Sequence, residues 1–324
     1  MSFQKILQVE KHDFYIDLAF ASATKAAKAM KSKHFKLPRH EIIRKVEITK
    51  LSVINRLVSE HLTKLADSFP DIDLLSVFYY ELIRSTLDIG LFKKSIAALR
   101  WIIKTSDTLT TKYVGIVNQT KNPDKMMQYR REYYGRISSL FKQTKETFVF
   151  LHEARKTFRS YPIVKDMPTV AICGFPNIGK TTLLSKLTSS KPEIADYAFT
   201  TKSLNMGYAE VGHKKIQFID TPGTLNRFDK MNFIERQAYL AAKYCANVII
   251  YIYDLSEPYS LRDQQLLLQK FKEFNKPIII YLSKTDILPK EIVSQFKGDK
   301  DIILTIKELN SRISTHIKEL ETKS

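Results

Sequence analysis

The feature that most constrains this chain is the segment 174–181, which reads Gly-Phe-Pro-Asn-Ile-Gly-Lys-Thr. It matches the G-x-x-x-x-G-K-[ST] phosphate loop, in which glycines let backbone N–H groups converge on phosphate oxygens at a helix N-terminus. Residues 169–173 before it are mostly apolar and β-branched, as in a buried parallel strand, and helix formers follow it. The segment therefore predicts a nucleoside triphosphate site formed by Gly174, Phe175, Pro176, Asn177, Ile178, Gly179, Lys180, Thr181 and Thr182.

The composition is that of a globular protein with room for two cores, since 44% of its 324 residues are apolar and 27% are charged. Its two cysteines, Cys173 and Cys245, cannot build a disulfide framework or a zinc site. No apolar run approaches the roughly 18–20 residues of a membrane span, and the N-terminus lacks the apolar core of a signal peptide. We expect a cytoplasmic monomer that has no membrane among its partners.

The net charge of +18 is unevenly distributed. Residues 1–160 contain 29 Lys and Arg against 16 Asp and Glu, a net charge of +13, whereas residues 161–324 contain 23 against 18, a net charge of +5. Such an excess favours a polyanionic partner, with RNA ahead of membrane lipid, although solvated helix faces are the alternative. The first candidate contact run has no acid among residues 18–40 and comprises Lys25, Lys28, Lys31, Lys33, Lys36 and Arg39. The second comprises Lys121, Lys125, Arg130 and Arg131.

The N-terminal half has helical periodicity with Pro or Gly near each break. This pattern predicts helices at 12–32, 39–68, 72–88, 90–119 and 123–157. One apolar stripe in the second of these comprises Leu51, Ile54, Leu57, Val58, Leu62 and Leu65. Short connections between long helices favour an antiparallel bundle, which we place at residues 1–162 as a basic all-α domain.

From residue 163 onward, apolar strand-like runs alternate with helical segments. Strands are predicted at 169–173, 206–211, 215–219, 247–253, 277–282 and 301–305. Helices are predicted near 180–188, 232–244, 260–274, 289–296 and 307–322. This alternation predicts an α/β domain at 163–324 with a mostly parallel, doubly wound sheet, whose ligand lies at the carboxyl ends of the strands.

Three downstream elements, taken together in their order along the chain, favour GTP over ATP, and two of them follow predicted strands. Asp220-Thr221-Pro222-Gly223 follows a strand, where the carboxylate can hold Mg²⁺ through water and the Gly223 N–H can meet the γ-phosphate. Ser283-Lys284-Thr285-Asp286 follows another strand, where Asp286 can accept two N–H groups of guanine and the Lys284 stem can cover the base.

A candidate switch lies between the phosphate loop and Asp220. It reads Asp-Tyr-Ala-Phe-Thr-Thr over 196–201, and its last threonine can turn toward Mg²⁺ when a γ-phosphate is present. We expect Phe199, Thr200 and Thr201 to contact the nucleotide. We expect Thr181 and Thr201 to bind Mg²⁺ and Asp220 to hold it through water.

Residues 169–286 resemble the Obg-like branch of translation-factor-related GTPases, through Gly-x-Pro-Asn-x-Gly-Lys, Tyr-x-Phe-Thr-Thr and Asp-Thr-Pro-Gly. A helical half followed directly by this G domain is similar to the nucleolar GTP-binding (Nog) family. Because the chain ends soon after the G domain, it resembles the compact archaeal form. The resemblance implies a P-loop GTPase that binds GTP and GDP with Mg²⁺. It also implies a role in assembling the large ribosomal subunit through ribosomal RNA and ribosomal proteins.

The chain departs from the family pattern at three places. Ser283 stands where the guanine motif usually has Asn, and the last guanine motif is placed only weakly at Thr305, Ile306 and Lys307. Thr224 stands where signalling GTPases have a water-orienting Gln, so catalysis must rely on positioning and charge neutralisation.

We therefore expect slow, Mg²⁺-dependent hydrolysis, with catalytic roles for Lys180, Thr201, Gly223 and Asn177. Asn177 resembles the asparagine that coordinates K⁺ in related GTPases, which makes K⁺ a candidate second cation. Two other functions stay open: an Obg-like regulator of mature ribosomes or of stress responses, and a GTP-binding structural placeholder with little turnover.

Overall fold

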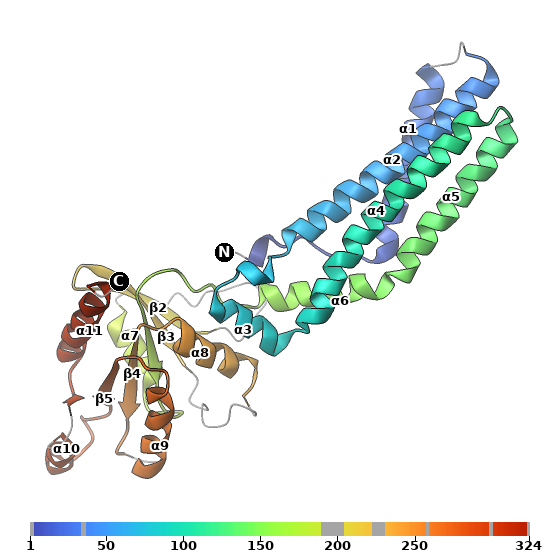
Figure 1. Cartoon of the computed structure of the whole chain (residues 1–324). Helices are drawn as coiled ribbons and strands as arrows, with labels where there is room; N and C mark the ends of the chain where they lie inside the picture. Colours follow the sequence, from blue (N-terminus) through green and yellow to red (C-terminus); the bar gives the residue numbers. More distant parts are fainter. Residues whose placement is uncertain are drawn as a thin grey trace. The chain divides into compact units, whose positions relative to one another are not determined.

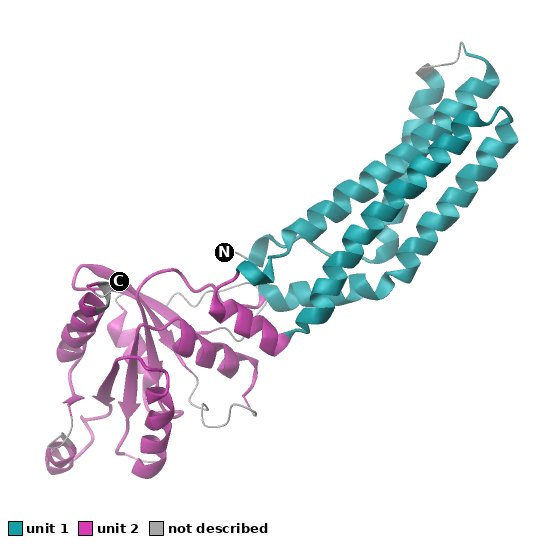
Figure 2. Ribbon diagram, in the orientation of Figure 1, with its two compact units in different colours: residues 1–74, 87–159 teal, residues 75–86, 160–324 magenta. Residues whose placement is uncertain are grey.

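The structure is a computed structural model of the chain. It describes residues 3–33, 37–188, 204–221, 231–256, 259–297 and 301–322. Figure 2 shows that the chain divides into two compact units. Unit 1 comprises residues 1–74 and 87–159, and unit 2 comprises residues 75–86 and 160–324.

Unit 1 is helical, as predicted for the N-terminal half. Short 3₁₀ turns lie at Phe3–Lys5 and Ile72–Leu74. The long helices of the unit are α1 (His12–Lys33), α2 (Arg39–Ser68), α4 (Ile89–Gln119), α5 (Pro123–Gln143) and α6 (Lys145–Arg159). Figure 1 shows α1, α2, α4 and α5 side by side.

The neighbouring helices α2 and α4 run in opposite directions, as expected for an antiparallel bundle. Arg44, near the start of α2, donates a hydrogen bond to the carbonyl of Thr120 just after α4, at 3.2 Å. Farther along α2, the Asn55 amide donates to Asp107 in the middle of α4, at 3.0 Å. The predicted apolar stripe of α2 faces the core, where its buried members are Leu51, Ile54, Val58, Leu62 and Leu65.

Local sequence signals explain where these helices begin and end. The Asp88 side chain accepts a hydrogen bond from the Leu91 N–H at the start of α4, and Asn122 caps α5 in the same way, followed by Pro123. The single helix predicted over 123–157 is wrong, because the structure has two helices that meet at Thr144. The Thr144 hydroxyl donates to backbone carbonyls one turn earlier, a bond that competes with regular helix geometry.

A buried acid, Glu47, links α2 to α5 inside unit 1. Its side chain is 4% exposed and pairs with Lys50 at 2.9 Å and with Arg130 at 3.1 Å. The Arg130 guanidinium also lies over the Tyr134 ring, which stacks on Phe20 of α1 at 4.3 Å. Arg130 therefore has a structural role within the bundle, and the second candidate contact run keeps Lys121, Lys125 and Arg131 as exposed cations.

Unit 2 is an α/β domain built on a six-stranded sheet with the order β2-β3-β1-β4-β5-β6. Its strands are β1 (Thr169–Cys173), β2 (Met206–Val211), β3 (Lys214–Asp220), β4 (Val248–Tyr253), β5 (Ile278–Leu282) and β6 (Ile302–Ile303). Only the β2–β3 pair is antiparallel among the described pairs, so the predicted mostly parallel sheet is confirmed. The last strand is shorter than the predicted 301–305.

Helices cover both faces of this sheet, as Figure 1 shows with α11 on one side and α8 and α9 on the other. The helices of unit 2 that follow β1 are α7 (Lys180–Leu187), α8 (Phe233–Tyr244), α9 (Leu261–Lys272), α10 (Lys290–Lys297) and α11 (Ile306–Glu321). Because β1 and β4 are covered on both faces, every one of their residues is buried. In the described part of the chain, no helix combines the length and apolar character needed to cross a membrane.

Helix α3 (Val77–Thr86) belongs to unit 2 because it packs on α8. The Arg236 guanidinium of α8 donates to the Ser85 carbonyl at 2.7 Å, and the hydroxyls of Tyr161 and Thr86 share a hydrogen bond at 2.5 Å. The helix predicted over 72–88 is therefore a 3₁₀ turn in unit 1 followed by a shorter helix in unit 2.

We predict that Glu47→Gln destabilises unit 1 by about 1–3 kcal/mol, because it leaves Arg130 and Lys50 without their partly buried counter-charge. Trp101 is the one tryptophan of the sequence and lies on α4, so its fluorescence during urea unfolding reports on this unit. The matched control is Glu60→Gln, which breaks the exposed pair with Arg56 on the same helix and should change stability by less than about 0.5 kcal/mol. Equal urea midpoints for the two variants would contradict the structural role of Glu47.

Candidate nucleotide-binding site

The candidate site lies where four strands of unit 2 end. Parallel register pairs Ile172 of β1 with Asp220 of β3, and Tyr253 of β4 with Leu282 of β5. The phosphate loop, Asp220, the residues after β4 and the Ser-Lys-Thr-Asp motif therefore meet at one edge of the sheet. This edge is the expected ligand position in a parallel α/β sheet.

The phosphate loop turns sharply between β1 and α7, and its backbone requires particular residues. Gly174 has a φ of +146°, and a Cβ there would lie 2.3 Å from the Ile178 side chain and 3.0 Å from the Ile252 carbonyl. Asn177 has a φ of +60°, in the left-handed region that asparagine tolerates better than most residues. The loop leads directly into the N-terminus of α7, which provides positive potential for an anion.

Lys180, at the start of α7, is 7% exposed, and its ammonium donates to the Phe175 carbonyl of its own loop at 2.5 Å. Burial lowers the pKa of Lys180, an effect that the nearby Asp220 carboxylate opposes. A phosphate group brought to the loop would be a stronger acceptor for this ammonium than a neutral carbonyl.

Asp220 and Thr181 form a pair with the chemistry of a Mg²⁺ site. The Thr181 hydroxyl donates to Asp220 Oδ2 at 2.6 Å, and Asp220 Oδ1 is buried without a hydrogen-bond partner in the part of the chain that the structure describes. Burial raises the pKa of Asp220, and the hydrogen bond from Thr181 partly offsets this rise. A cation near these oxygens would satisfy the unpaired atom and favour the ionised carboxylate, so the two residues fit Mg²⁺.

The phosphate loop and the guanine motif line one cavity of about 520 Å³. Its lining residues are Asn177, Gly179, Lys180, Thr181, Thr182, Leu183, Lys186, Tyr281, Ser283, Lys284 and Asp286. Residues about a hundred positions apart in the sequence thus meet around a space that contains three lysines and one aspartate. This combination suits a phosphorylated ligand with a polar base.

Several predicted contact residues shape the loop instead of lining this cavity. Phe175 is buried and stacks on Tyr259, and Ile178 is fully buried in the core. The hydroxyl of Thr221 donates to the Ile172 carbonyl at 2.8 Å, so it ties β3 to β1. Gly174 and Pro176 also do not line the cavity.

The predicted last guanine motif lies at the start of α11. Thr305 precedes this helix, and its hydroxyl accepts a hydrogen bond from the Glu308 N–H at 3.3 Å, as a helix cap does. Thr305, Ile306 and Lys307 are not among the residues that line the 520 Å³ cavity. The predicted residues Phe199, Thr200, Thr201, Pro222 and Gly223 lie outside the described residues.

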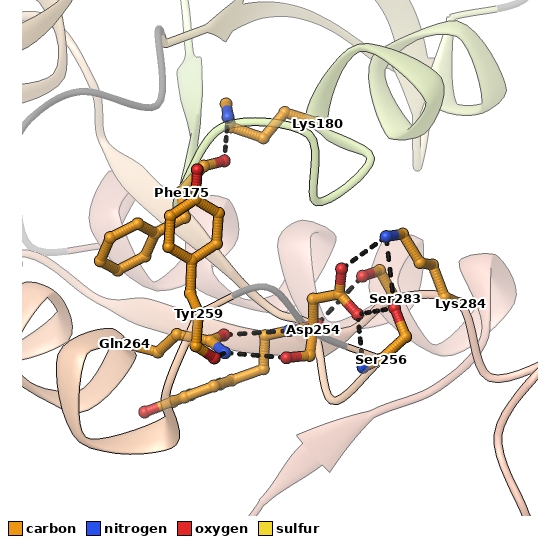
Figure 3. Close-up of polar contacts among 9 residues, drawn as sticks. Phe175, Lys180, Asp254, Ser256, Tyr259, Gln264, Ser283 and Lys284 are labelled. Carbon is orange, nitrogen blue, oxygen red and sulfur yellow. Dashed lines mark hydrogen bonds and ion pairs between the residues drawn. The ribbon is translucent and has the colours of Figure 1, made fainter.

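The sequence analysis did not single out three residues that connect Lys284 to the phosphate loop: Asp254, Tyr259 and Gln264. Figure 3 shows their side chains and backbone linked to Lys284 and to the phosphate loop. One signal in the sequence was Asp254 itself, a carboxylate directly after the buried strand β4. No local pattern indicated Gln264, which lies ten positions farther along the chain.

Comparison with known proteins agrees with this geometry. A family model described as a 50S ribosome-binding GTPase matches residues 169–284, and one described as the NOG1 N-terminal helical domain matches residues 3–165. An uncharacterized protein of Methanocaldococcus jannaschii is 36% identical over 295 residues, which are 90% of this chain and 83% of that protein.

Eukaryotic relatives are longer than this chain. Nucleolar GTP-binding protein 1 of Drosophila melanogaster is 27% identical and covers 100% of this chain but 51% of its own length. The Saccharomyces cerevisiae protein of the same name is also 27% identical, and the match covers 85% of this chain and 43% of that protein. The chain thus spans about half of the length of these curated relatives. Among solved structures, the G domain of the T. maritima FeoB iron transporter is 25% identical, with a TM-score of 0.38 over 47% of this chain and 99% of that one.

The sheet order, the phosphate loop and the family match define unit 2 as a P-loop GTPase domain. The match to the N-terminal helical domain extends over half of the chain, and the archaeal relative matches most of it. The chain belongs to the nucleolar GTP-binding (Nog) family.

Proposed function

We propose that this protein binds GTP and hydrolyses it slowly with Mg²⁺, and that it acts as a nucleotide-switched factor in large ribosomal subunit assembly. In this proposal, unit 1 contacts ribosomal RNA and ribosomal proteins of the precursor particle. The observation that carries the proposal is the single cavity lined by the phosphate loop and the Ser-Lys-Thr-Asp motif, in a chain whose N-terminal half is a basic Nog helical domain.

The predicted site residues, some of which line the cavity, have separate roles in this proposal. Lys180 and the loop N–H groups bind the phosphates, and Asp286 and Lys284 bind guanine. Thr181, Thr201 and Asp220 hold Mg²⁺, which neutralises charge on the β- and γ-phosphate oxygens when bound. Gly223 meets the γ-phosphate through its N–H, and Asn177 is the residue proposed to bind K⁺.

We expect slow hydrolysis because the chain has no Gln at the position that orients the attacking water in signalling GTPases. Thr224 occupies the position at which signalling GTPases have Gln. Lys180 and Asn177 can stabilise charge on phosphate oxygens, but neither accepts a proton from water at neutral pH. The absence of a Gln at position 224 also supports a second candidate function, a GTP-binding placeholder with little turnover. Single-turnover hydrolysis, measured with and without ribosomal subunits, distinguishes the two functions.

The candidate RNA-binding surface lies at one end of unit 1, where α1 ends, α2 and α5 begin and α4 ends (Figure 1). At this end, Arg44 in the second turn of α2 donates a hydrogen bond to Thr120, in the connection between α4 and α5. Its exposed cations have no acidic partner in the described parts of the chain, and we name them the basic tip: Lys28, Lys31, Arg39, Lys121 and Lys125. Members of both basic runs thus lie at the same end of unit 1, which supports a surface suited to RNA phosphates, while Lys36 lies outside the described residues.

We predict that Asp286→Asn weakens GDP binding by about 100-fold or more, because it loses a charged acceptor for two guanine N–H groups. The same variant should bind xanthosine diphosphate better than the wild type does, since xanthine presents an acceptor that pairs with the new amide. Titration with ribose-labelled fluorescent nucleotides measures both affinities. The control is Asp166→Asn, an exposed aspartate of unit 2 that precedes the amino end of β1. Unchanged GDP binding in Asp286→Asn would contradict the base-reading role.

We also predict that replacing four lysines of the basic tip by Gln (Lys28, Lys31, Lys121 and Lys125) weakens binding to deproteinised large-subunit ribosomal RNA. The slope of log K against log salt should become shallower by about 2–3, because fewer counterions are released. The control removes the same charge from exposed lysines at the other end of the bundle, Lys64, Lys94, Lys142 and Lys145.

An equal loss of RNA affinity in both variants would mean that net charge alone, and not the basic tip, binds RNA.

Sedimentation of the tagged protein with precursor large subunits would support the assembly role. Sedimentation with mature ribosomes would instead support the Obg-like regulatory alternative.

A further inference from the structure

The Ser-Lys-Thr-Asp motif of this chain is anchored to the end of β4. Ser283, which replaces the usual Asn, is 7% exposed, and both its N–H and its hydroxyl donate to the Tyr253 carbonyl, at 2.9 and 3.0 Å. Tyr253 is the last residue of β4. In the described part of the chain, Ser283 therefore attaches the guanine motif to the end of β4 and forms no hydrogen bond with the phosphate loop.

Lys284 and Asp254, which directly follow Ser283 and Tyr253, form a second contact between the Ser-Lys-Thr-Asp motif and the end of β4. The Lys284 ammonium lies 2.6 Å from Asp254 Oδ2, and the Asp254 side chain is 1% exposed (Figure 3). The other carboxylate oxygen accepts hydrogen bonds from the N–H and the hydroxyl of Ser256, at 2.9 and 2.7 Å. Burial alone would raise the pKa of Asp254, but the hydrogen bonds from Lys284 and Ser256 lower it below its ordinary value. Asp254 is thus a fixed anion whose partner is the lysine expected to cover the base.

Gln264 of α9 holds the backbone of Asp254 in place. Its amide donates to the Asp254 carbonyl at 2.8 Å and accepts from the Asp254 N–H at 3.0 Å, while its side chain is almost fully buried. The same amide group donates to the Tyr259 carbonyl at 3.1 Å. The Tyr259 ring stacks on Phe175 of the phosphate loop, with ring centres 4.4 Å apart.

We propose that Asp254 and Gln264 are positioning residues for guanine recognition, which fix the Lys284 side chain over the base and link it to the phosphate loop through Tyr259 and Phe175. In this proposal, the linkage connects the Ser-Lys-Thr-Asp motif to the phosphate loop, with which Ser283 forms no hydrogen bond among the described residues. A free lysine side chain would lose about 2 kcal/mol of rotamer entropy on covering the base, and a side chain already held by Asp254 loses less. The inference rests on guanine binding in the 520 Å³ cavity.

The test is a double-mutant cycle on the full chain with ribose-labelled fluorescent GDP. Asp254→Asn should weaken GDP binding by about tenfold, mainly through faster release, because the Lys284 side chain is no longer held. Lys284→Met keeps the apolar stem and removes the ammonium. In that background, Asp254→Asn should cause no further loss, since the residue acts through Lys284.

The outcomes separate three conclusions. If Asp254→Asn weakens binding equally in both backgrounds, Asp254 acts through general folding of the site, and the inference is wrong. If it weakens binding in neither, the inference is also wrong, while the proposed function stands because the wild type still binds GDP. Failure of the wild type to bind GDP would remove the proposed function itself.

A milder variant and a control complete the design. Ser256→Ala removes one hydrogen bond to Asp254 and the hydrogen bond that Lys284 donates to the Ser256 hydroxyl at 3.3 Å, without changing any charge. It therefore tests the same linkage if Asp254→Asn does not fold. We expect about threefold faster GDP release from it, and an unchanged rate would overturn the inference. The control Asp73→Asn breaks an exposed Lys–Asp pair of unit 1, with Lys93, and should leave GDP release unchanged.

Discussion

The nucleotide cavity depends on the hydrogen-bonded position of β1 between β3 and β4. Parallel pairing on both sides of β1 places the phosphate loop between Asp220 and the residues that follow β4. Because β1 and β4 are completely buried, the strand ends cannot shift without disturbing the core. The buried sheet thus holds a loop with left-handed backbone positions, at Gly174 and Asn177, in a shape suited to phosphate.

Charge in the two units is used in different ways. In unit 2, the buried acids Asp220 and Asp254 each face a partner that fixes their orientation, Thr181 and Lys284. In unit 1, the buried acid Glu47 neutralises two cations between helices, whereas the lysines at the end of the bundle are exposed. The cations of the basic tip are therefore accessible to a polyanion. This division supports the proposal that one unit binds a nucleotide and the other binds RNA.

Much of the fold could be predicted because its signals are local. Pro and Gly breaks defined most helices of unit 1, and apolar β-branched runs defined the strands around the phosphate loop. The break at Thr144 was missed because helical periodicity continues across it, and a single side-chain hydrogen bond is too weak a signal to reveal it. The boundary around α3 could not be predicted either, since it depends on contacts of Ser85 and Thr86 with residues more than seventy positions away.

In the candidate site, too, the residues of contiguous motifs could be predicted, and those that depend on long-range packing could not. Lys180, Thr181, Lys284 and Asp286 belong to contiguous motifs, and the structure brings them to one cavity. Asp254 and Gln264 belong to no contiguous motif, because their importance comes from packing α9 against the end of β4. The placement of the last guanine motif at 305–307 depends on one short match. In the structure, Thr305 caps α11, and none of the three residues lines the cavity.

The central claim is that a phosphate-binding loop and a guanine-reading aspartate act on one ligand. Titration calorimetry of the full chain with GDP and with ADP, both in the presence of Mg²⁺, tests this claim most directly. We expect GDP to bind at least about 100-fold more tightly than ADP, since adenine lacks the paired donors that Asp286 accepts. Equal affinities for the two nucleotides, or no binding of either, would contradict the account.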